Sequence, residues 1–245
     1  MGDKQFVKLN PAKMGVEFLG IVTPKHQSML VDALETVKRD MGASWKARLK
    51  AKKIFWVNIW QNPNHIEDNS DAMGISDPKI AKSLHKWCHK AARKYCGRKA
   101  IIDSYGFAVN PIGSQYQPWH IDYSTDRANV FITVTPFTEK NATQYITLPL
   151  NTPGEILEQA ASNVDKIDVD ALERGVDYLI VQQIVAKEMS VLYMGRGTIH
   201  RGIPNTGKGD RVVFYISVHF IKDYDKNYPY RSYSLSHPER RVESF

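Results

Sequence analysis

Two stretches in the first hundred residues carry apolar side chains at the three-to-four-residue spacing of an amphipathic helix. One begins after Thr23-Pro24 and the other after Asp77-Pro78, and each pair combines an N-cap residue with proline at the first helical position. A helix is therefore predicted from each proline. Their apolar positions are Met29, Leu30, Leu34 and Val37 in the first, and Ile80, Leu84, Trp87, Cys88, Ala91 and Tyr95 in the second.

From about residue 101 the pattern changes to short β-rich runs separated by turn residues, which favours a sandwich or a barrel. A proline at position 118 confines its run to a sheet edge or to the start of a strand. Two helical pieces, Glu155–Ala161 and Val169–Arg174, are expected to interrupt the strands. The predicted strands are Ile54–Trp60, Ser104–Val109, Tyr116–Ile121, Asn129–Thr135, Gln144–Leu148, Ser190–Met194, Thr198–Ile203 and Arg211–Phe220.

The composition is that of an ordinary globular protein, with 245 residues of which 42% are hydrophobic and 24% are charged. We expect one domain over 1–245, with mostly helical flanking structure over 1–100 and a β core over 101–222. A helical insertion at 152–176 and a C-terminal tail at 223–245 complete this division. No apolar run approaches 18 residues, so a membrane span is excluded.

Cys88 and Cys96 lie eight residues apart on the second predicted helix. A helical rise of about 12 Å between them exceeds the roughly 7 Å limit for a disulfide, so we expect free thiols and a reducing compartment. The N-terminus shows no apolar segment typical of a secretory signal. A cytoplasmic location is therefore expected.

The net charge of +7 is unevenly distributed, because residues 38–100 hold 15 Lys or Arg against 5 Asp or Glu. A solvated helix face accounts for such a region, and it can also attract an anionic partner. We expect it to face the barrel mouth in part and to favour a small anionic substrate. No nucleic-acid-binding motif accompanies the charge, although a nucleic-acid-binding or nucleic-acid-modifying protein stays as an alternative.

The strongest candidate for chemistry is His120-Ile121-Asp122. On a strand, residues two apart share one face, so this imidazole and this carboxylate converge. His200, in strand-like sequence after a glycine turn, can supply a third ligand. Two histidines and one carboxylate on one face form the facial triad of non-haem Fe(II) oxygenases.

Arg211 opens the strand that follows His200, eleven residues further along the chain. A guanidinium in that position can hold a dicarboxylate through two parallel hydrogen bonds. Arg201 and Arg196 are the alternative candidates for this role.

Trp119-His120-Ile121-Asp122 resembles the W-H-x-D stretch of the phytanoyl-CoA dioxygenase-like family of Fe(II)/2-oxoglutarate-dependent oxygenases. The resemblance extends from about 104 to 217, nearly half the chain. In the segment Thr138–Thr143 the acidic residue is displaced by one position relative to the family, and Ala142 stands where the family has glycine. The loop at 148–151 has diverged from the family. The similar segments are Phe18–Val22, Thr138–Thr143, Leu148–Asn151, Lys187-Glu188 with Ser190–Met194, and His200–Asn205.

The resemblance implies a mainly β fold with flanking helices, built on a double-stranded β-helix of the jelly-roll, cupin-like type. It implies Fe(II) on His120, Asp122 and His200, with 2-oxoglutarate chelating the iron and its far carboxylate on Arg211. O2 is then the other cosubstrate, and succinate and CO2 are released. Asp122 favours hydroxylation or desaturation over halogenation, because related halogenases carry a small residue there.

Four further residues are candidates for binding the cosubstrate or the substrate, with ordinary packing as the alternative for each. Thr133 shares a strand face with Phe131, and the other three lie near the metal strand. Trp119 is out of phase with His120 and is expected to pack rather than to bind. The four candidates are Thr133, Asn110, Gln117 and Tyr105.

Two other functions fit parts of the pattern. A cupin would hold a metal in a similar barrel without 2-oxoglutarate, but cupins usually carry H-x-H with a further His within a few tens of residues. Here the motif is H-x-D, and His200 follows Asp122 by 78 positions. A non-catalytic barrel is disfavoured by the complete triad together with Arg211.

Overall fold

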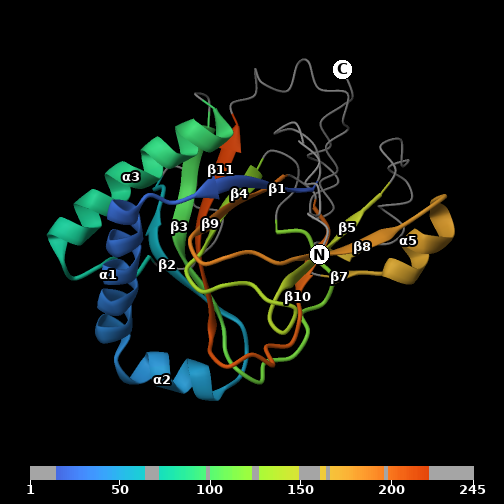
Figure 1. Cartoon of the computed structure of the whole chain (residues 1–245), viewed down its shortest axis with the longest axis horizontal. Helices are drawn as coiled ribbons and strands as arrows, with labels where there is room; N and C mark the ends of the chain where they lie inside the picture. Colours follow the sequence, from blue (N-terminus) through green and yellow to red (C-terminus); the bar gives the residue numbers. More distant parts are fainter. Residues whose placement is uncertain are drawn as a thin grey trace.

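The computed structural model describes residues 15–63, 72–97, 100–122, 127–148, 161–163, 166–195 and 198–220. Within these ranges a six-stranded antiparallel sheet faces a three-stranded one, and two long helices cover the outside of the larger sheet (Figure 1). The predicted jelly-roll core with flanking helices is confirmed. The tail 223–245 lies outside the described residues, as does all but Ala161 of the helix expected over Glu155–Ala161.

The large sheet joins strands from both ends of the chain. The two strands contributed by the first hundred residues lie at its opposite edges, so this part of the chain is more than a helical flank. In spatial order the strands are β1 (Val16–Ile21), β9 (Ser190–Met194), β4 (Arg127–Thr133), β11 (Arg211–Phe220), β3 (Ala100–Asn110) and β2 (Phe55–Gln61).

The small sheet has the order β10 (His200–Gly202), β5 (Thr143–Thr147) and β8 (Ile180–Ile184). Helix α5 (Val169–Gly175) packs on its outer side through Leu172, together with Ile146 and Ile199. A short ribbon of β6 (Ala161–Asn163) and β7 (Lys166–Ile167) precedes α5. Both sheets therefore have a covered outer face and a shared inner face.

The two predicted long helices are α1 (Pro24–Met41) and α3 (Pro78–Cys96). The Asp77 carboxylate caps α3 by accepting hydrogen bonds from the backbone N–H groups of Lys79 and Ile80 at 2.8 and 3.1 Å. Thr23 makes no such bond at the start of α1. Both cysteines are buried and unpaired, as their spacing on one helix predicts.

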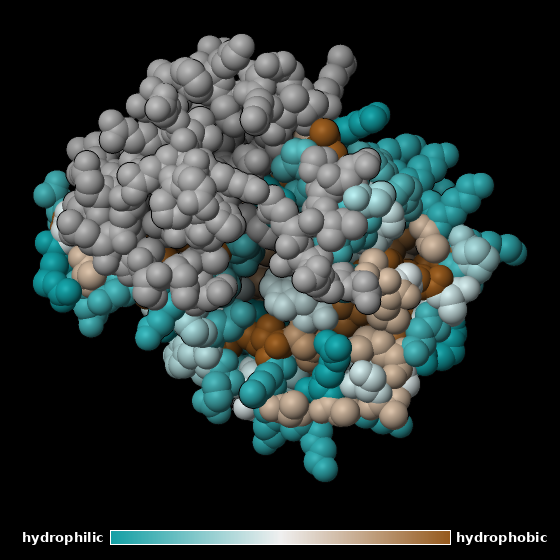
Figure 2. Space-filling view, turned by 180° about the vertical axis from the view of Figure 1, so that it is seen from behind, coloured by the Kyte–Doolittle hydropathy of each residue, from teal (hydrophilic) through white to brown (hydrophobic). Residues whose placement is uncertain are grey.

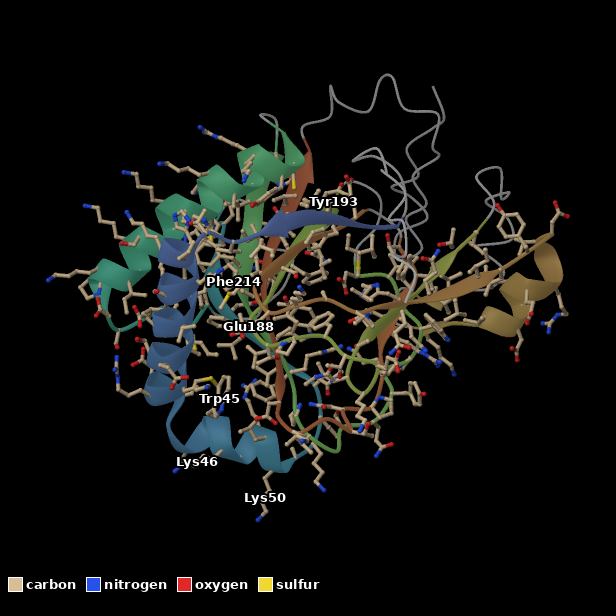
Figure 3. The ribbon with its side chains drawn as sticks, viewed as in Figure 1. Trp45, Lys46, Lys50, Glu188, Tyr193 and Phe214 are labelled. Atoms are coloured by element: carbon tan, nitrogen blue, oxygen red, sulfur yellow. The ribbon has the colours of Figure 1, made fainter. Side chains whose placement is uncertain are left out.

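Alternation along β11 assigns its side chains to the two faces of the large sheet. Phe214 and its even-numbered neighbours pack in the core beneath α1 and α3. Val213 packs instead in the cluster that lies between the sheets, with Tyr145 of β5 and Leu192 of β9. Figure 3 labels Phe214 in the middle of the molecule, close to the helices. Arg211 and Ser217, in phase with Val213, therefore face inward.

The structure differs from the prediction in one expected strand and in two elements that were not expected. Tyr116–Ile121 forms no continuous strand, and only His120 makes a bridge, because Pro118 removes a donor from this segment. Helix α2 (Ala43–Lys50) was not predicted, since among its residues only Trp45 is buried. Trp45 points inward, whereas Lys46 and Lys50 point away from the protein (Figure 3). Strand β8 was also not predicted.

The cations of α3 lie on the side of the helix opposite its buried stripe, and all are exposed. They point away from the inner face of the sheets, because the apolar side of α3 must pack on the outer face of the large sheet. The cations of α3 therefore do not contribute to the part of the 38–100 region that is expected to face the barrel mouth. In Figure 2, hydrophilic side chains protrude around the rim, and the visible apolar patches lie further in. The exposed cations are Lys79, Lys82, Lys86, Lys90, Arg93 and Lys94.

Among the described helices, none combines the length and the apolar character that crossing a membrane requires.

The Asp77 cap predicts a measurable loss of stability on truncation. We expect Asp77→Ala to lower the free energy of unfolding by about 1 kcal/mol, because two N–H groups at the start of α3 lose their acceptor. Denaturant titration followed by circular dichroism measures this. Thr23→Ala is the matched control with a smaller expected effect, and equal losses in both variants would contradict the assignment.

Candidate metal centre

Two histidines distant in sequence are placed side by side by a pair of backbone hydrogen bonds. The His120 N–H donates to the His200 carbonyl at 3.0 Å, and the His200 N–H donates to the His120 carbonyl at 2.9 Å. The centroids of the two rings lie 4.4 Å apart. This reciprocal pair puts both imidazoles on the inner side of the small sheet.

Each imidazole is fixed by a carbonyl two residues earlier in the chain. His120 Nδ1 lies 2.8 Å from the oxygen of Pro118, and His200 Nδ1 lies 2.9 Å from the oxygen of Thr198. A carbonyl only accepts hydrogen bonds, so Nδ1 of each ring carries the proton. Both Nε2 atoms face the same carboxylate, and each can offer a lone pair to a metal when its ring is neutral.

That carboxylate belongs to Asp122. Its Oδ1 lies 3.5 Å from Nε2 of His120 and 3.4 Å from Nε2 of His200. Its Oδ2 accepts a hydrogen bond of 2.7 Å from Asn129 Nδ2, and Asn129 Oδ1 accepts one of 2.5 Å from the Ser217 hydroxyl. Burial raises the pKa of Asp122, but the charge and hydrogen bonds of the imidazoles outweigh it and bring the pKa below its usual value.

The three ligand atoms lie within 4.8 Å of one another, and among the described residues no other group of three His, Cys, Asp or Glu does so. Two neutral imidazole nitrogens and one carboxylate oxygen suit a first-row divalent metal such as Fe(II). Side-chain exposures of 15%, 16% and 8% for His120, Asp122 and His200 show that the site is recessed but still partly accessible to solvent. The structure therefore brings together the three ligands that the sequence predicts.

Arg211 is buried at the start of β11, and its guanidinium is held by one nitrogen. Nη1 donates to the carbonyl oxygens of Asn141 and Ala142 and to the Thr143 hydroxyl, at 2.9 to 3.1 Å. Nε has no partner although it is buried, and no hydrogen bond joins Nη2 to any described residue. The edge formed by Nε and Nη2 is the one that binds a carboxylate through two hydrogen bonds.

Burial lowers the pKa of Arg211 to about 10, so its guanidinium is still a cation at neutral pH. A buried cation with an unsatisfied N–H is costly unless an anion pairs with it. Phe137 covers one face of the guanidinium, with the ring centroid 5.1 Å from its central carbon. This arrangement is suited to receive an acidic group of a ligand.

Gly202 makes room for Arg211 beside the triad. It lies two residues after His200 on the same face of β10, opposite Thr143 of β5. A Cβ at this position would lie 3.1 Å from Arg211 Nη2 and 2.7 Å from Gln117 Oε1. The guanidinium thus passes directly over this glycine, within one strand repeat of His200.

The remaining predicted site residues are placed less favourably. The Thr133 hydroxyl donates to the Lys187 carbonyl at 2.6 Å and accepts from the Ser190 N–H at 3.0 Å, so it is used in a turn. The Asn110 amide is likewise used, by the Ile203 carbonyl at 3.2 Å and the Ser114 hydroxyl. Both residues face inward, and both side chains are already engaged in hydrogen bonds within the protein.

Of the other two predicted binding residues, Gln117 lies at the site and Tyr105 does not. Gln117 lies beside the site, where its Oε1 accepts a 2.8 Å hydrogen bond from the Gly202 N–H. Tyr105 lies on the helix side of the large sheet, stacked on Trp60 at 5.5 Å and hydrogen-bonded to His85 at 3.2 Å. The prediction that Tyr105 lies near the metal site is wrong. Side chains alternate along β3, and the odd-numbered ones, Tyr105 and Phe107 among them, lie in the core beneath the helices.

The sequence did not single out Asn129, Thr143 or Tyr145. Asn129 occupies an inward position of β4 in phase with Phe131, which could have drawn attention to it as a polar residue on an apolar face. Thr143 and Tyr145 lie opposite Gly202 and His200 in the register of β5 with β10. That register joins segments more than fifty residues apart, and no local pattern reports it.

No family model and no curated protein matches the chain by sequence. Solved structures do share its fold. AviO1 from Streptomyces viridochromogenes Tue57 has a TM-score of 0.56 at 12% identity, over 85% of this chain and 91% of that protein. SnoK, a non-heme alpha-ketoglutarate-dependent carbocyclase of nogalamycin biosynthesis, has a TM-score of 0.53 at 13% identity, over 84% and 80%. HygX from Streptomyces hygroscopicus, with nickel and 2-oxoglutarate bound, has 0.51 at 9%, over 84% and 82%.

The contacts of Gly202 generate a prediction on stability. We expect Gly202→Ala to destabilise the protein by roughly 1–3 kcal/mol, because the added methyl group enters space filled by Gln117 and Arg211. Gly209→Ala is the control, since a Cβ there would meet nothing within 4 Å. Unfolding midpoints of the two variants measure the difference. A Gly202→Ala protein as stable as its control would show that the guanidinium does not occupy this position.

Proposed function

We propose that the chain is an Fe(II)/2-oxoglutarate-dependent oxygenase of the phytanoyl-CoA dioxygenase-like kind, acting on a small organic substrate. The observation that carries the proposal is the pairing of the triad with the unsatisfied Nε–Nη2 edge of Arg211 beside it. A metal site alone fits many proteins, whereas a buried guanidinium lacking an anion next to it fits a cosubstrate with a carboxylate. The fold shared with SnoK and HygX supports this choice.

In this proposal His120, Asp122 and His200 hold the iron through their Nε2 atoms and Oδ1, and Arg211 binds the far carboxylate of 2-oxoglutarate. Iron and its cosubstrates supply the oxidising chemistry, in which substrate C–H, O2 and 2-oxoglutarate give substrate C–OH, succinate and CO2. The carbonyls of Pro118 and Thr198 keep both imidazoles in the tautomer that can bind a metal. Asn129 holds the second oxygen of Asp122, so that Oδ1 stays directed at the imidazoles.

Hydroxylation or desaturation is the proposed outcome, because Asp122 occupies the position that a halide would need. An anionic substrate was expected from the cations of residues 38–100. The outward direction of the α3 cations removes part of that support, so the class of substrate proposed here is a small organic molecule of unspecified charge. We also propose a single domain, since β1 and β2 belong to the same sheet as the strands of the core.

The alternatives are less well supported by the geometry. A cupin without 2-oxoglutarate would leave the buried Nε of Arg211 unexplained. A nucleic-acid-modifying enzyme would need its cations near the triad, whereas those of α3 lie on the outer side of the large sheet. Charge steering of a small ligand weakens only moderately with salt, whereas binding to phosphates falls steeply, so a salt titration separates the two.

The triad predicts one metal ion per chain. We expect His120→Ala and His200→Ala each to remove most binding of Co(II), used as an oxygen-stable substitute for Fe(II), and all turnover of 2-oxoglutarate with Fe(II). Isothermal titration measures the binding. His26→Ala, which removes a histidine of α1 stacked on Trp87, is the control and should bind one equivalent. Stoichiometric metal in the His120→Ala/His200→Ala double variant would exclude the site.

Arg211 predicts how the cosubstrate is bound. We expect Arg211→Ala to raise the KM for 2-oxoglutarate at least tenfold, because a desolvated carboxylate loses its charged partner at a cost of roughly 2–5 kcal/mol. Binding of Co(II) should persist. Arg211→Lys keeps the charge but cannot form two parallel hydrogen bonds to a carboxylate. Its KM for 2-oxoglutarate should therefore lie between those of the wild-type protein and Arg211→Ala. An unchanged KM would transfer the role to Arg196, which lies outside the described residues, since Arg201 points to the other face of β10.

A further inference from the structure

Arg201 lies between His200 and Gly202 in β10, and its side chain is on the opposite face from the triad. Its guanidinium carbon lies 4.4 Å from the ring centroid of Tyr116 and 4.3 Å from that of Trp119. Its Nε donates to Gln144 Oε1 of the neighbouring strand β5 at 2.9 Å. The guanidinium is therefore in contact with two aromatic rings and is anchored at its edge.

The segment that carries Tyr116 and Trp119 also carries His120, and it is hydrogen-bonded to β10 through Gln117 and His120. Gln117 donates its N–H to the Gly202 carbonyl at 3.0 Å, and the His120–His200 pair follows three residues later. Between these points Pro118 has no N–H to donate. The Trp119 carbonyl accepts instead from the Ile167 N–H of β7, at 2.7 Å.

We propose, on the basis of the function proposed above, that Arg201 is a positioning residue for the metal centre. It holds the 116–119 segment against the outer face of β10 and thereby sets the position of His120 relative to His200. The contacts with Tyr116 and Trp119 lie on either side of Pro118, which has no N–H to donate to β10. Arg201 does not touch the metal ligands' side chains, because adjacent residues of a strand point to opposite faces.

The residue type at position 201 follows from this role. A guanidinium is planar and can stack on aromatic rings while its edge donates to an amide, so one side chain can join three partners. A lysine ammonium is a point charge on a flexible stem and cannot make the same set of contacts. Gln144 extends the connection to β5, which is itself paired with His200 through Tyr145.

The first test compares Arg201→Lys with the wild-type protein by titration with Co(II), with visible absorption as the second readout. We expect the affinity for Co(II) to fall by on the order of tenfold, the size seen when groups that orient metal ligands are changed. The d–d bands should also shift, because the geometry of the ligands changes. A purely structural role for Arg201 would leave these bands unaltered.

Arg48→Lys is the matched control. Arg48 also lies over an aromatic ring, that of Phe55 at 5.7 Å, and donates to the Trp56 carbonyl, but it is exposed and its partners belong to β2 and not to the 116–120 segment or β10. It should leave Co(II) affinity and spectrum unchanged. An equal change in both variants would overturn the proposal, because a general loss of stability would then explain it.

The second test uses Tyr116, a residue that is 54% exposed, so its truncation carries little risk of misfolding even if Arg201→Lys does not fold. Tyr116→Phe keeps the ring and should bind Co(II) like the wild-type protein. Tyr116→Ala removes one side of the contact and should weaken binding and shift the bands. Undiminished affinity with an unaltered spectrum in Tyr116→Ala would overturn the proposal.

The failure of this proposal can be told apart from the failure of the proposed function. If the wild-type protein binds one Co(II) but Tyr116→Ala and Arg201→Lys match it, only the positioning role is wrong. If the wild-type protein binds no metal at all, both are wrong.

Discussion

The site depends on the reciprocal backbone hydrogen bonds between His120 and His200. These two bonds join an irregular segment to a strand of three residues and bring the two imidazoles side by side. Because each Nδ1 is bonded to a carbonyl two residues back, the geometry of the backbone also sets the tautomer of each ring. A metal would therefore meet ligands that are already oriented, and little ordering entropy would remain to be lost on binding.

The polar groups inside the barrel are organised around the cost of burying charge. Asp122 is held by two imidazoles and by the Asn129–Ser217 pair, so its carboxylate is compensated from both sides. Arg211 is compensated only in part, since its Nη1 has three acceptors while Nε has none. Asp122 therefore has all its partners within the protein, whereas Arg211 still lacks one. This difference is the reason for assigning an acidic cosubstrate to Arg211.

The fold places the proposed metal centre and the cations of α3 on opposite sides of the large sheet. The outer face of the large sheet is covered by α1 and α3, whose apolar sides form the main core, and the cations of α3 remain in solvent (Figure 1). The inner face carries Asn129, Ser217 and Arg211 on the same sheet. The small sheet supplies His200 from its inner face and the stacked Arg201 from its outer face, and the irregular segment bridged to β10 supplies His120. One strand, β10, thus carries both a ligand of the proposed metal centre, His200, and the proposed positioning residue, Arg201.

The sequence by itself determined the features that depend on neighbouring residues. Proline after an N-cap fixed the starts of α1 and α3, and the spacing of His120 and Asp122 put both on one side of their segment. The order of motifs along the chain was enough to pair them with His200 and Arg211. The tertiary structure decided whatever depends on register between distant strands. It turned Tyr105 to the outer core, engaged the Thr133 and Asn110 side chains in hydrogen bonds within the protein, and brought Asn129 to Asp122 and Thr143 to Arg211. A shift of one residue in pairing reverses the face of every side chain on a strand, and no local pattern contains that information.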